Sequence, residues 1–267
     1  MTPADPFFIA GCPRSGTTLL SVLLDRHSRL CVPPETGFFP EVAPELPSRD
    51  DASLLDTLRR WPRLPELNLT PEAVLRRLGG RPASPAGVLT AILDLYAQAE
   101  GKARCGEKTP QHLPHVPAIL ECFPGARIVC LVRDGRDVAL SLRAMPWGPP
   151  TLADAAALWK SFVRLADGLA EQHPDQFMVV YYEKLVIRPG QVLPDVMAFL
   201  GEEFEPRQVQ PHLPSDVVLP RSFAWKGRAL GPLDPGRIGK RRQEATAEEN
   251  AFLDQVVFDE LRHHGYA

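Results

Sequence analysis

Residues 7–20, FFIAGCPRSGTTLL, constrain the fold more than any other stretch of the sequence. The apolar run at 7–10 predicts a strand, and leucines at helical spacing predict a helix over about 17–27. The loop between them spaces Gly11 and Gly16 as a phosphate-binding G-x-x-x-x-G loop does. A strand, a glycine-rich loop and a helix in this order predict an anion site at the helix N-terminus.

The loop lacks the lysine that follows the second glycine in ATP-binding loops, because Thr17 stands there. Arg14 supplies a cation from within the loop, and Thr17 and Thr18 supply hydroxyls. Such a site suits a doubly esterified, less highly charged anion, such as a phosphosulfate, and no metal is expected in it. The residues predicted to hold this anion are Pro13, Arg14, Ser15, Gly16, Thr17 and Thr18.

The composition excludes several classes of protein. The chain has 267 residues, of which 44% are hydrophobic and 24% charged, and its net charge of −3 does not favour a nucleic-acid partner. No apolar run approaches the ~18 residues of a membrane span, and the run at 7–10 is too short for a signal peptide. The expectation is therefore a cytoplasmic protein. Five cysteines without a Cys-x-x-Cys pair predict neither a disulfide scaffold nor a zinc site.

Alternating strands and helices along the chain predict a parallel sheet with helices on both faces. The near-continuous apolar runs at 127–132 and 177–182 are typical of central parallel strands, and a short strand is expected around 103–107. Helices are expected at 135–143, 152–171 and from 183 to Leu200. We predict a single domain over 1–267 with a P-loop-like, three-layer α/β/α fold.

Residues 40–101 change character and predict a helical insertion. They are rich in proline, and Thr70-Pro71 and Ser84-Pro85 each place an N-cap before a proline at the first helical position. We expect residues 36–101 and 143–152 to select the substrate that would accept a transferred group, called the acceptor below. Their aromatic and apolar candidates are Phe38, Phe39, Trp61, Met145 and Trp147, although these side chains would equally suit the interior of a helical lid.

A second cationic position follows the strand at 127–132. Arg133 ends that strand, and Ser141 comes eight residues later in the next helix. Ligands of parallel α/β sheets lie at this carboxyl edge, so Arg133 and Ser141 could bind a second phosphate. A nucleotide triphosphatase would place a magnesium-binding acid there, and the arginine argues against one. A surface cluster of ion pairs is the alternative interpretation.

Taken together, these motifs resemble the sulfotransferases that use 3′-phosphoadenosine 5′-phosphosulfate (PAPS). PRSGTTLL resembles their 5′-phosphosulfate loop, Arg133 and Ser141 match their 3′-phosphate motif, and VVYYEKLVIRPGQVLPDVMAFLG resembles their strand and helix that include Tyr182. LLDRHSRLCVPPETGFF is closest to the branch of protein-tyrosine sulfotransferases and bacterial natural-product enzymes. The resemblance implies PAPS as donor and 3′,5′-adenosine bisphosphate (PAP) as product, without a metal.

The resemblance also implies roles for individual residues. Glu35 matches the general base of the protein-tyrosine enzymes, although Pro34 replaces their preceding glutamate. Lys108, in CGEKTP, matches a catalytic lysine that would act with Arg14 on the charge of the transferred group. His112 and His115 are rival candidates for the base. The acceptor would be a hydroxyl of a small molecule, a natural product or a peptide tyrosine, and the sequence leaves a homodimer open.

The segment 221–242 carries seven Lys or Arg against one Asp, a local charge of +6. We interpret it as part of a basic flap, about 214–243, that closes over the donor. Its candidate ligands are Ser222, Arg237 and Lys240. Protein-tyrosine members carry a disulfide near the positions of Cys31 and Cys105, but free thiols are expected in a cytoplasmic protein.

Two other functions stay open from the sequence. A P-loop nucleotide kinase or other NTPase would share the strand–loop–helix unit, but Thr17 replaces its lysine. A non-catalytic nucleotide-binding protein of the same fold would not require Glu35, Lys108, Arg14 and Arg133 together.

Overall fold

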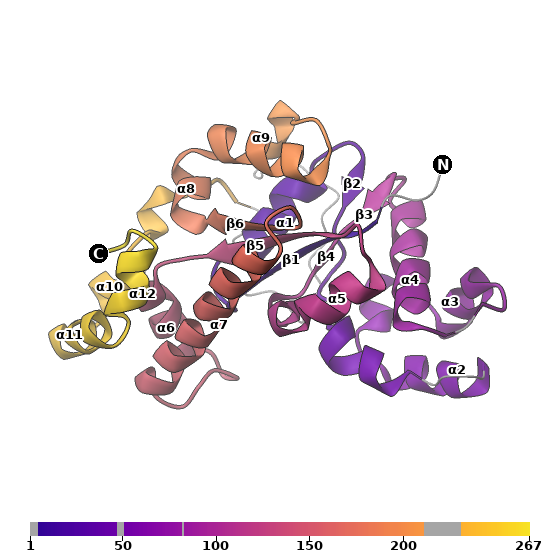
Figure 1. The fold of residues 1–267 in the computed structure, drawn as a ribbon, viewed down its shortest axis with the longest axis horizontal. Coiled ribbons are helices and arrows are strands. Elements are labelled where there is room, and N and C mark those ends of the chain that lie inside the picture. The colour runs from indigo at the N-terminus through magenta and orange to yellow at the C-terminus, as the bar shows by residue number, and fades with distance from the viewer. Residues whose placement is uncertain (1–4, 47–50, 82, 211–230) are drawn as a thin grey trace.

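A four-stranded parallel sheet forms the centre of the computed structural model, which describes residues 5–46, 51–81, 83–210 and 231–267 (Figure 1). The strand order is β4-β1-β5-β6. The strands are β1 (Phe7–Gly11), β4 (Glu107–Lys108), β5 (Arg127–Val132) and β6 (Phe177–Tyr181). In the register, Ile9 of β1 lies opposite Lys108 on one side and Val129 on the other. The predicted α/β fold with a parallel sheet is confirmed.

The sheet is buried on both faces, which is why its strands are almost continuously apolar. On β1, Phe7 and Ile9 pack with leucines of the first helix, whereas Phe8 and Ala10 belong to the core on the opposite face. The first face is covered by α1 (Thr17–Asp25), α8 (Tyr182–Ile187) and α9 (Pro189–Leu200). The other is covered by α5 (Val116–Cys122), α6 (Gly135–Arg143) and α7 (Leu152–Gln172), as Figure 1 shows.

Three helices form the segment predicted as an insertion: α2 (Asp51–Arg60), α3 (Pro71–Leu78) and α4 (Pro85–Ala99). The hydroxyls of Thr70 and Ser84 cap α3 and α4 as predicted, accepting backbone N–H groups three residues on. Buried side chains of these helices join the same apolar core as one face of the sheet. The segment therefore packs on the sheet. A small parallel sheet of β2 (Leu30–Cys31) and β3 (Arg104–Cys105) lies beside it.

Two expectations for the second half of the chain are wrong. The strand at 177–181 pairs with β5 alone in the described part of the sheet, so it is an edge strand and not a central one. The helix expected up to Leu200 is two helices, because the backbone leaves the helical conformation at Arg188. The residue before a proline is sterically pushed away from that conformation, and Pro189 follows.

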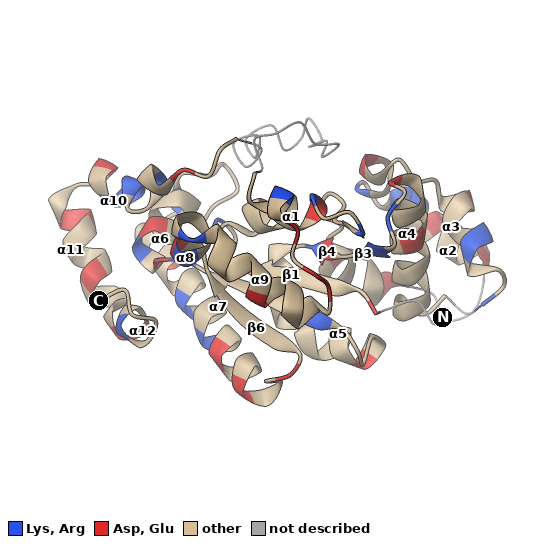
Figure 2. Cartoon of the chain, turned by 90° about the horizontal axis from the view of Figure 1, so that it is seen from above, with Lys and Arg blue, Asp and Glu red and all other residues tan. Residues whose placement is uncertain are grey.

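The C-terminal segment returns to the sheet as α10 (Lys240–Glu244), α11 (Ala247–Val256) and α12 (Phe258–His263). A capping box formed by Thr246 and Glu249 starts α11. Basic and acidic residues are interspersed along the helices in the view of Figure 2. Among the described helices, none combines the length and the apolar character needed to cross a bilayer.

Candidate active site

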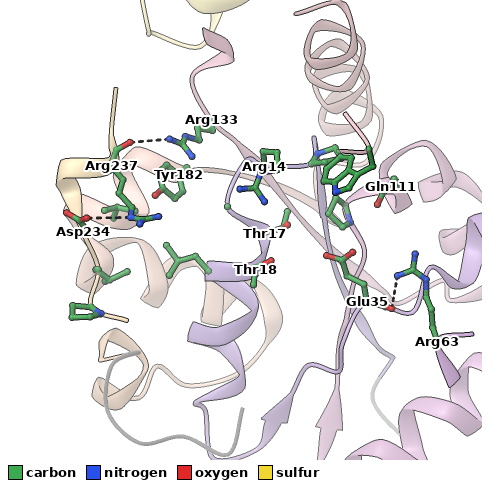
Figure 3. A pocket seen from close by; sticks show the side chains of 18 residues that line it. Arg14, Thr17, Thr18, Glu35, Arg63, Gln111, Arg133, Tyr182, Asp234 and Arg237 are labelled. Atoms are coloured by element: carbon green, nitrogen blue, oxygen red, sulfur yellow. Dashed lines mark hydrogen bonds and ion pairs between the residues drawn. The ribbon is translucent and has the colours of Figure 1, made fainter. Parts of the chain in front are cut away.

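A cavity of about 480 Å³ opens at the carboxyl ends of β1 and β5, where the topology of a parallel sheet places ligands (Figure 3). Figure 3 shows Arg14, Thr17 and Thr18 between two groups of side chains. Arg133, Tyr182 and Arg237 lie at one end, and Glu35 and Arg63 at the other. The lining residues are Pro13, Arg14, Gly16, Thr17, Thr18, Leu19, Glu35, Arg63, Pro110, Gln111, Arg133, Trp147, Tyr182, Val186, Pro232, Leu233, Asp234 and Arg237.

The glycine-rich loop has a backbone that few residues tolerate. Gly16 has a φ of 102°, and a Cβ there would lie 2.4 Å from the ring of Tyr182. Arg14 also has a positive φ, of 75°, which is uncommon for a residue with a side chain. Ser15 is fully buried, and its hydroxyl has no hydrogen-bond partner in the part of the chain that the structure describes. The loop thus holds a conformation and a hydroxyl that suit a bound anion.

Two arginines line this part of the cavity, Arg14 from the loop itself and Arg133 from the end of β5. The Nε of Arg14 donates to the hydroxyl of Ser141 over 3.1 Å, which joins the loop to α6. The guanidinium of Arg133 lies 4.4 Å from the ring centroid of Tyr182 and donates to Asp137 over 3.0 Å. The Nε of Arg133 is buried and has no hydrogen-bond partner among the described residues. It is therefore available to an anion at this end of the cavity.

The C-terminal segment reaches the same end of the cavity. Arg133 donates to the backbone carbonyl of Arg237 over 3.2 Å, and Asp137 accepts the backbone N–H of Gly239 over 2.8 Å. Arg237 lines the cavity and pairs with Asp234 at 3.4 Å. Burial raises the pKa of Tyr182, so its phenol stays protonated beside these cations. This part of the predicted flap packs against the cavity.

Glu35 and Lys108 form an ion pair at the other end, with Nζ 2.6 Å from Oε1. The side chain of Lys108 is 4% exposed and that of Glu35 12% exposed, so the pair is shielded from bulk water. Lys108 is placed by β4, whose neighbour β1 leads directly into the glycine-rich loop. The carboxylate of Glu35 and the ammonium of Lys108 thus lie at the same cavity as the glycine-rich loop.

A second buried carboxylate, Glu107, supports this pair from behind. Its Oε1 accepts the hydroxyls of Thr36 and Thr109, each over 2.7 Å, and the backbone N–H of Thr36. Its Oε2 lies 2.6 Å from Nδ1 of His112. The backbone N–H of Phe39 donates to Nε2 of His112, which leaves Nδ1 to carry the proton that faces Glu107.

The electrostatics of Glu107 follow from these donors. Burial raises its pKa, but His112 and the two threonine hydroxyls outweigh burial and hold the pKa of Glu107 below its usual value. It is therefore an ionised carboxylate inside the core. Because Thr36 follows Glu35 and Lys108 follows Glu107, the network holds both members of the catalytic candidate pair.

The structure brings most of the predicted site residues together. Pro13, Arg14, Gly16, Thr17, Thr18, Glu35, Arg133, Tyr182 and Arg237 line the cavity. Ser15 and Ser141 lie behind the loop, and Lys108 reaches the cavity through Glu35. Lys240 instead points to Glu244, 3.9 Å away, and is outside the cavity wall. Ser222 lies outside the described residues.

Several other expectations are decided by burial. His112 is fully buried behind the cavity, and neither it nor His115 lines the wall. Of the acceptor candidates only Trp147 lines the cavity, whereas Phe38, Phe39 and Trp61 are packed in the core. Sequence reasoning missed Arg63, which precedes a short 3-10 helix (Leu64–Leu67), and Gln111, which lies in another (Pro110–His115); neither residue belongs to a motif. Cys31 and Cys105 are register partners in the small sheet and are free thiols.

Comparison with known proteins identifies the family of this chain. Residues 6–206 match the sequence model described as "Sulfotransferase family". The chain belongs to the sulfotransferase family. It is 30% identical over 205 residues to protein-tyrosine sulfotransferase 2 of Gallus gallus, an alignment covering 73% of this chain and 50% of that protein.

Two other relatives are also aligned over only part of their own length. This chain is 29% identical over 217 residues to nodulation protein NoeE of Sinorhizobium fredii, an alignment that covers 73% of this chain and 49% of NoeE. It is 28% identical to protein-tyrosine sulfotransferase of Drosophila melanogaster, of which 37% is covered. The chain thus spans about half the length, or less, of these curated relatives.

Solved structures include one of similar size. The sulfotransferase domain of the olefin synthase from Synechococcus PCC 7002 superimposes with a TM-score of 0.64 at 27% identity, covering 96% of this chain and 95% of that domain. Mouse sulfotransferase SULT7A1, crystallised with PAP, shares the fold with a TM-score of 0.51 at 13% identity.

Proposed function

We propose that this sulfotransferase-family chain transfers a sulfuryl group from PAPS to an acceptor hydroxyl, with Glu35 as general base. The observation that carries the proposal is the buried Glu35–Lys108 pair, at 2.6 Å, in one cavity with the glycine-rich loop. A carboxylate there suits removal of the hydroxyl proton. Cations on the loop side suit the charge on the sulfuryl group and on the bridging oxygen.

Three features of the cavity fit an anionic nucleotide donor. The buried hydroxyl of Ser15 and the Nε of Arg133 have no protein partner among the described residues, and the missing Cβ of Gly16 lets the glycine-rich loop pack directly against the ring of Tyr182. PAPS, when bound, supplies a sulfuryl group already activated on a phosphate leaving group. The loop with Arg14 would hold its 5′ end, and Arg133 with Ser141 its 3′-phosphate.

The ends of the cavity suggest how the substrates are arranged. With the anions between the loop and Arg133, the transferred group would face Glu35 and Lys108. The acceptor would then enter past Arg63, Gln111 and Trp147, of which Trp147 is half exposed. An acceptor with an apolar or aromatic surface suits this wall. The names of several relatives suggest a peptide tyrosine, and a hydroxyl of a natural product is the second acceptor class that we consider.

The acidic residues after β5 weigh against a magnesium-dependent kinase. The Oδ2 of Asp137 accepts from Arg133 and from the backbone N–H of Gly239, so this carboxylate is already paired with a cation. Asp134 caps α6 and accepts from Arg136 at 2.8 Å. An NTPase needs an acid of this strand end for its metal, and these two are already paired.

Calorimetric titration with PAP, and separately with ATP and magnesium, tests the proposal. We expect saturable binding of PAP that an excess of EDTA leaves unchanged. Binding of ATP–magnesium alone would support a kinase and overturn the proposal. After PAP binding is established, incubation with ³⁵S-labelled PAPS and the two acceptor classes measures transfer directly. Binding without transfer to any hydroxyl acceptor would favour a non-catalytic nucleotide-binding protein.

A further inference from the structure

A cluster of two histidines and an aspartate lies away from the cavity described above. His263 ends α12 and His264 follows it, while Asp167 belongs to α7, on which α12 packs (Figure 1). One potential ligand atom from each residue lies within 4.8 Å of the other two. None of the three lines the substrate cavity. We propose that these residues form a zinc site that fastens the C-terminal segment to α7 and β6.

The distances are close to those that a tetrahedral zinc ion requires. The Nε2 of His264 lies 3.3 Å from Oδ1 of Asp167, and the Nε2 of His263 lies 3.8 Å from Oδ2. Zinc binds nitrogen and oxygen at about 2.0–2.2 Å, so neighbouring ligand atoms stand roughly 3.3–3.6 Å apart. These two distances involve different oxygens of Asp167, and the three ligand atoms as a set lie within 4.8 Å of one another, so the exposed His263 would turn toward the other two when zinc binds.

The buried histidine of the cluster has an unused ligand atom. The side chain of His264 is 2% exposed, and its Nε2 makes no hydrogen bond with the described residues although it faces the carboxylate of Asp167. A metal ion satisfies both groups.

The surroundings of His264 match those of a metal-bound imidazole. Its other nitrogen, Nδ1, lies 3.2 Å from the hydroxyl of Tyr181, the last residue of β6. Such a partner for the second ring nitrogen orients the ring and exposes the first to the metal. Glu260, the nearby acid on α12, accepts from Arg164 over 2.8 Å and is already paired.

The donor set selects the kind of ion. Two imidazoles and one carboxylate suit zinc and other late transition metals, whereas magnesium and calcium prefer oxygen ligands alone. Three protein ligands leave a fourth position for water on the side of the exposed His263. The neighbouring Tyr266 donates to Glu183 over 2.6 Å, so a metal would reinforce an existing attachment beside Tyr182.

The test uses the complete chain without a histidine tag, stripped with EDTA and titrated with zinc sulfate by calorimetry. We expect one zinc ion per chain, with a Kd below about 10 µM. The melting temperature of the stripped protein should rise by roughly 5 °C when free zinc exceeds the Kd about 100-fold. A folded, stripped protein that binds no zinc saturably would overturn the proposal.

Matched variants assign the binding to this cluster. Asp167→Asn and His263→Ala alter partly or fully exposed side chains, so both should fold, and each should weaken zinc binding at least about tenfold. Tyr181→Phe should weaken it less. The control His115→Ala removes a partly exposed imidazole from another element and should bind zinc like the unmodified protein. Unchanged affinity in both Asp167→Asn and His263→Ala would contradict the assignment, as would loss of zinc binding in the control.

Discussion

Glu35 and Lys108 approach to 2.6 Å although 73 residues separate them in the chain. Lys108 is held in place by β4. Glu35 is held because the hydroxyl of the next residue, Thr36, donates a hydrogen bond to Glu107. The ion pair is therefore held from both sides before any substrate arrives. An arrangement held in this way loses little entropy when an acceptor hydroxyl takes its place beside Glu35.

Replacing Glu35 by Gln should remove the general base while preserving the shape of the side chain. We expect kcat for sulfuryl transfer to fall on the order of 10²–10⁴-fold, with the Kd for PAP within about twofold of its original value. Calorimetry and a radiolabelled transfer assay measure the two effects separately. The control is Glu45→Gln, which changes an exposed carboxylate in the helical segment. Retained turnover in Glu35→Gln would show that another group takes the proton.

Arg133→Ala should weaken PAP binding by about 10–100-fold, because a hydrogen bond to a charged group contributes about 1.5–3 kcal/mol. The matched control is Arg127→Ala, at the opposite end of the same strand, where the arginine donates to the carbonyl of Asp175. Its Kd for PAP should be unchanged. An equal effect of both substitutions would indicate a general loss of positive charge and no specific contact at Arg133.

Gly16→Ala should abolish donor binding. The residue has a left-handed φ of 102°, and its new Cβ would lie 2.4 Å from the ring of Tyr182. Gly80→Ala is an instructive comparison, because Gly80 has a φ of 77° but nothing within 4 Å of the added Cβ. It should cost about 1 kcal/mol of stability and leave PAP binding intact. Normal binding by Gly16→Ala would mean that the loop does not hold the donor.

Glu107→Gln should lower the free energy of unfolding by about 1–3 kcal/mol at pH 7, because it replaces an ionised acceptor with an amide. The pKa of Glu107 is lower in the folded than in the unfolded protein. Its ionised form therefore stabilises the fold above the unfolded pKa, near 4.5, and this stabilisation is lost as the pH falls through the folded pKa.

Urea unfolding at pH 7, 5 and 4 tests this linkage. The unmodified protein should lose more stability than Glu107→Gln between pH 5 and pH 4, so that the two curves converge on acidification. Parallel curves would show that Glu107 is not ionised in the folded protein. The same variant should lower kcat more than it changes PAP affinity, since Glu107 supports Glu35 and Lys108.

Thiol titration should find five free thiols per chain in denaturant without reductant. Three thiols would reveal a bridge between Cys31 and Cys105, which face one another in the small sheet. In the folded protein Cys122 should react first, because it is the one cysteine that is not buried. Burial also raises the pKa of Cys105 and slows its reaction further.

Local elements could be predicted where their signals lie in neighbouring residues. The bounds of β5 and α6 agree with the prediction, because an apolar run and the helix that follows it are properties of contiguous sequence. The caps at Thr70 and Ser84 agree for the same reason. The edge position of β6 could not be predicted from the sequence. A strand that is apolar on both faces has the same sequence pattern at any place in the sheet order.

The sequence by itself determined the glycine-rich loop at 11–16 between strand and helix, the parallel α/β architecture and the family resemblance, since these depend on short-range spacing. Only the tertiary structure decided that Glu35 meets Lys108 and that Glu107 lies behind them. It alone brought His263 and His264 to Asp167. These contacts join residues about 70 to 100 positions apart, and chain topology and packing, which no local pattern encodes, bring them together.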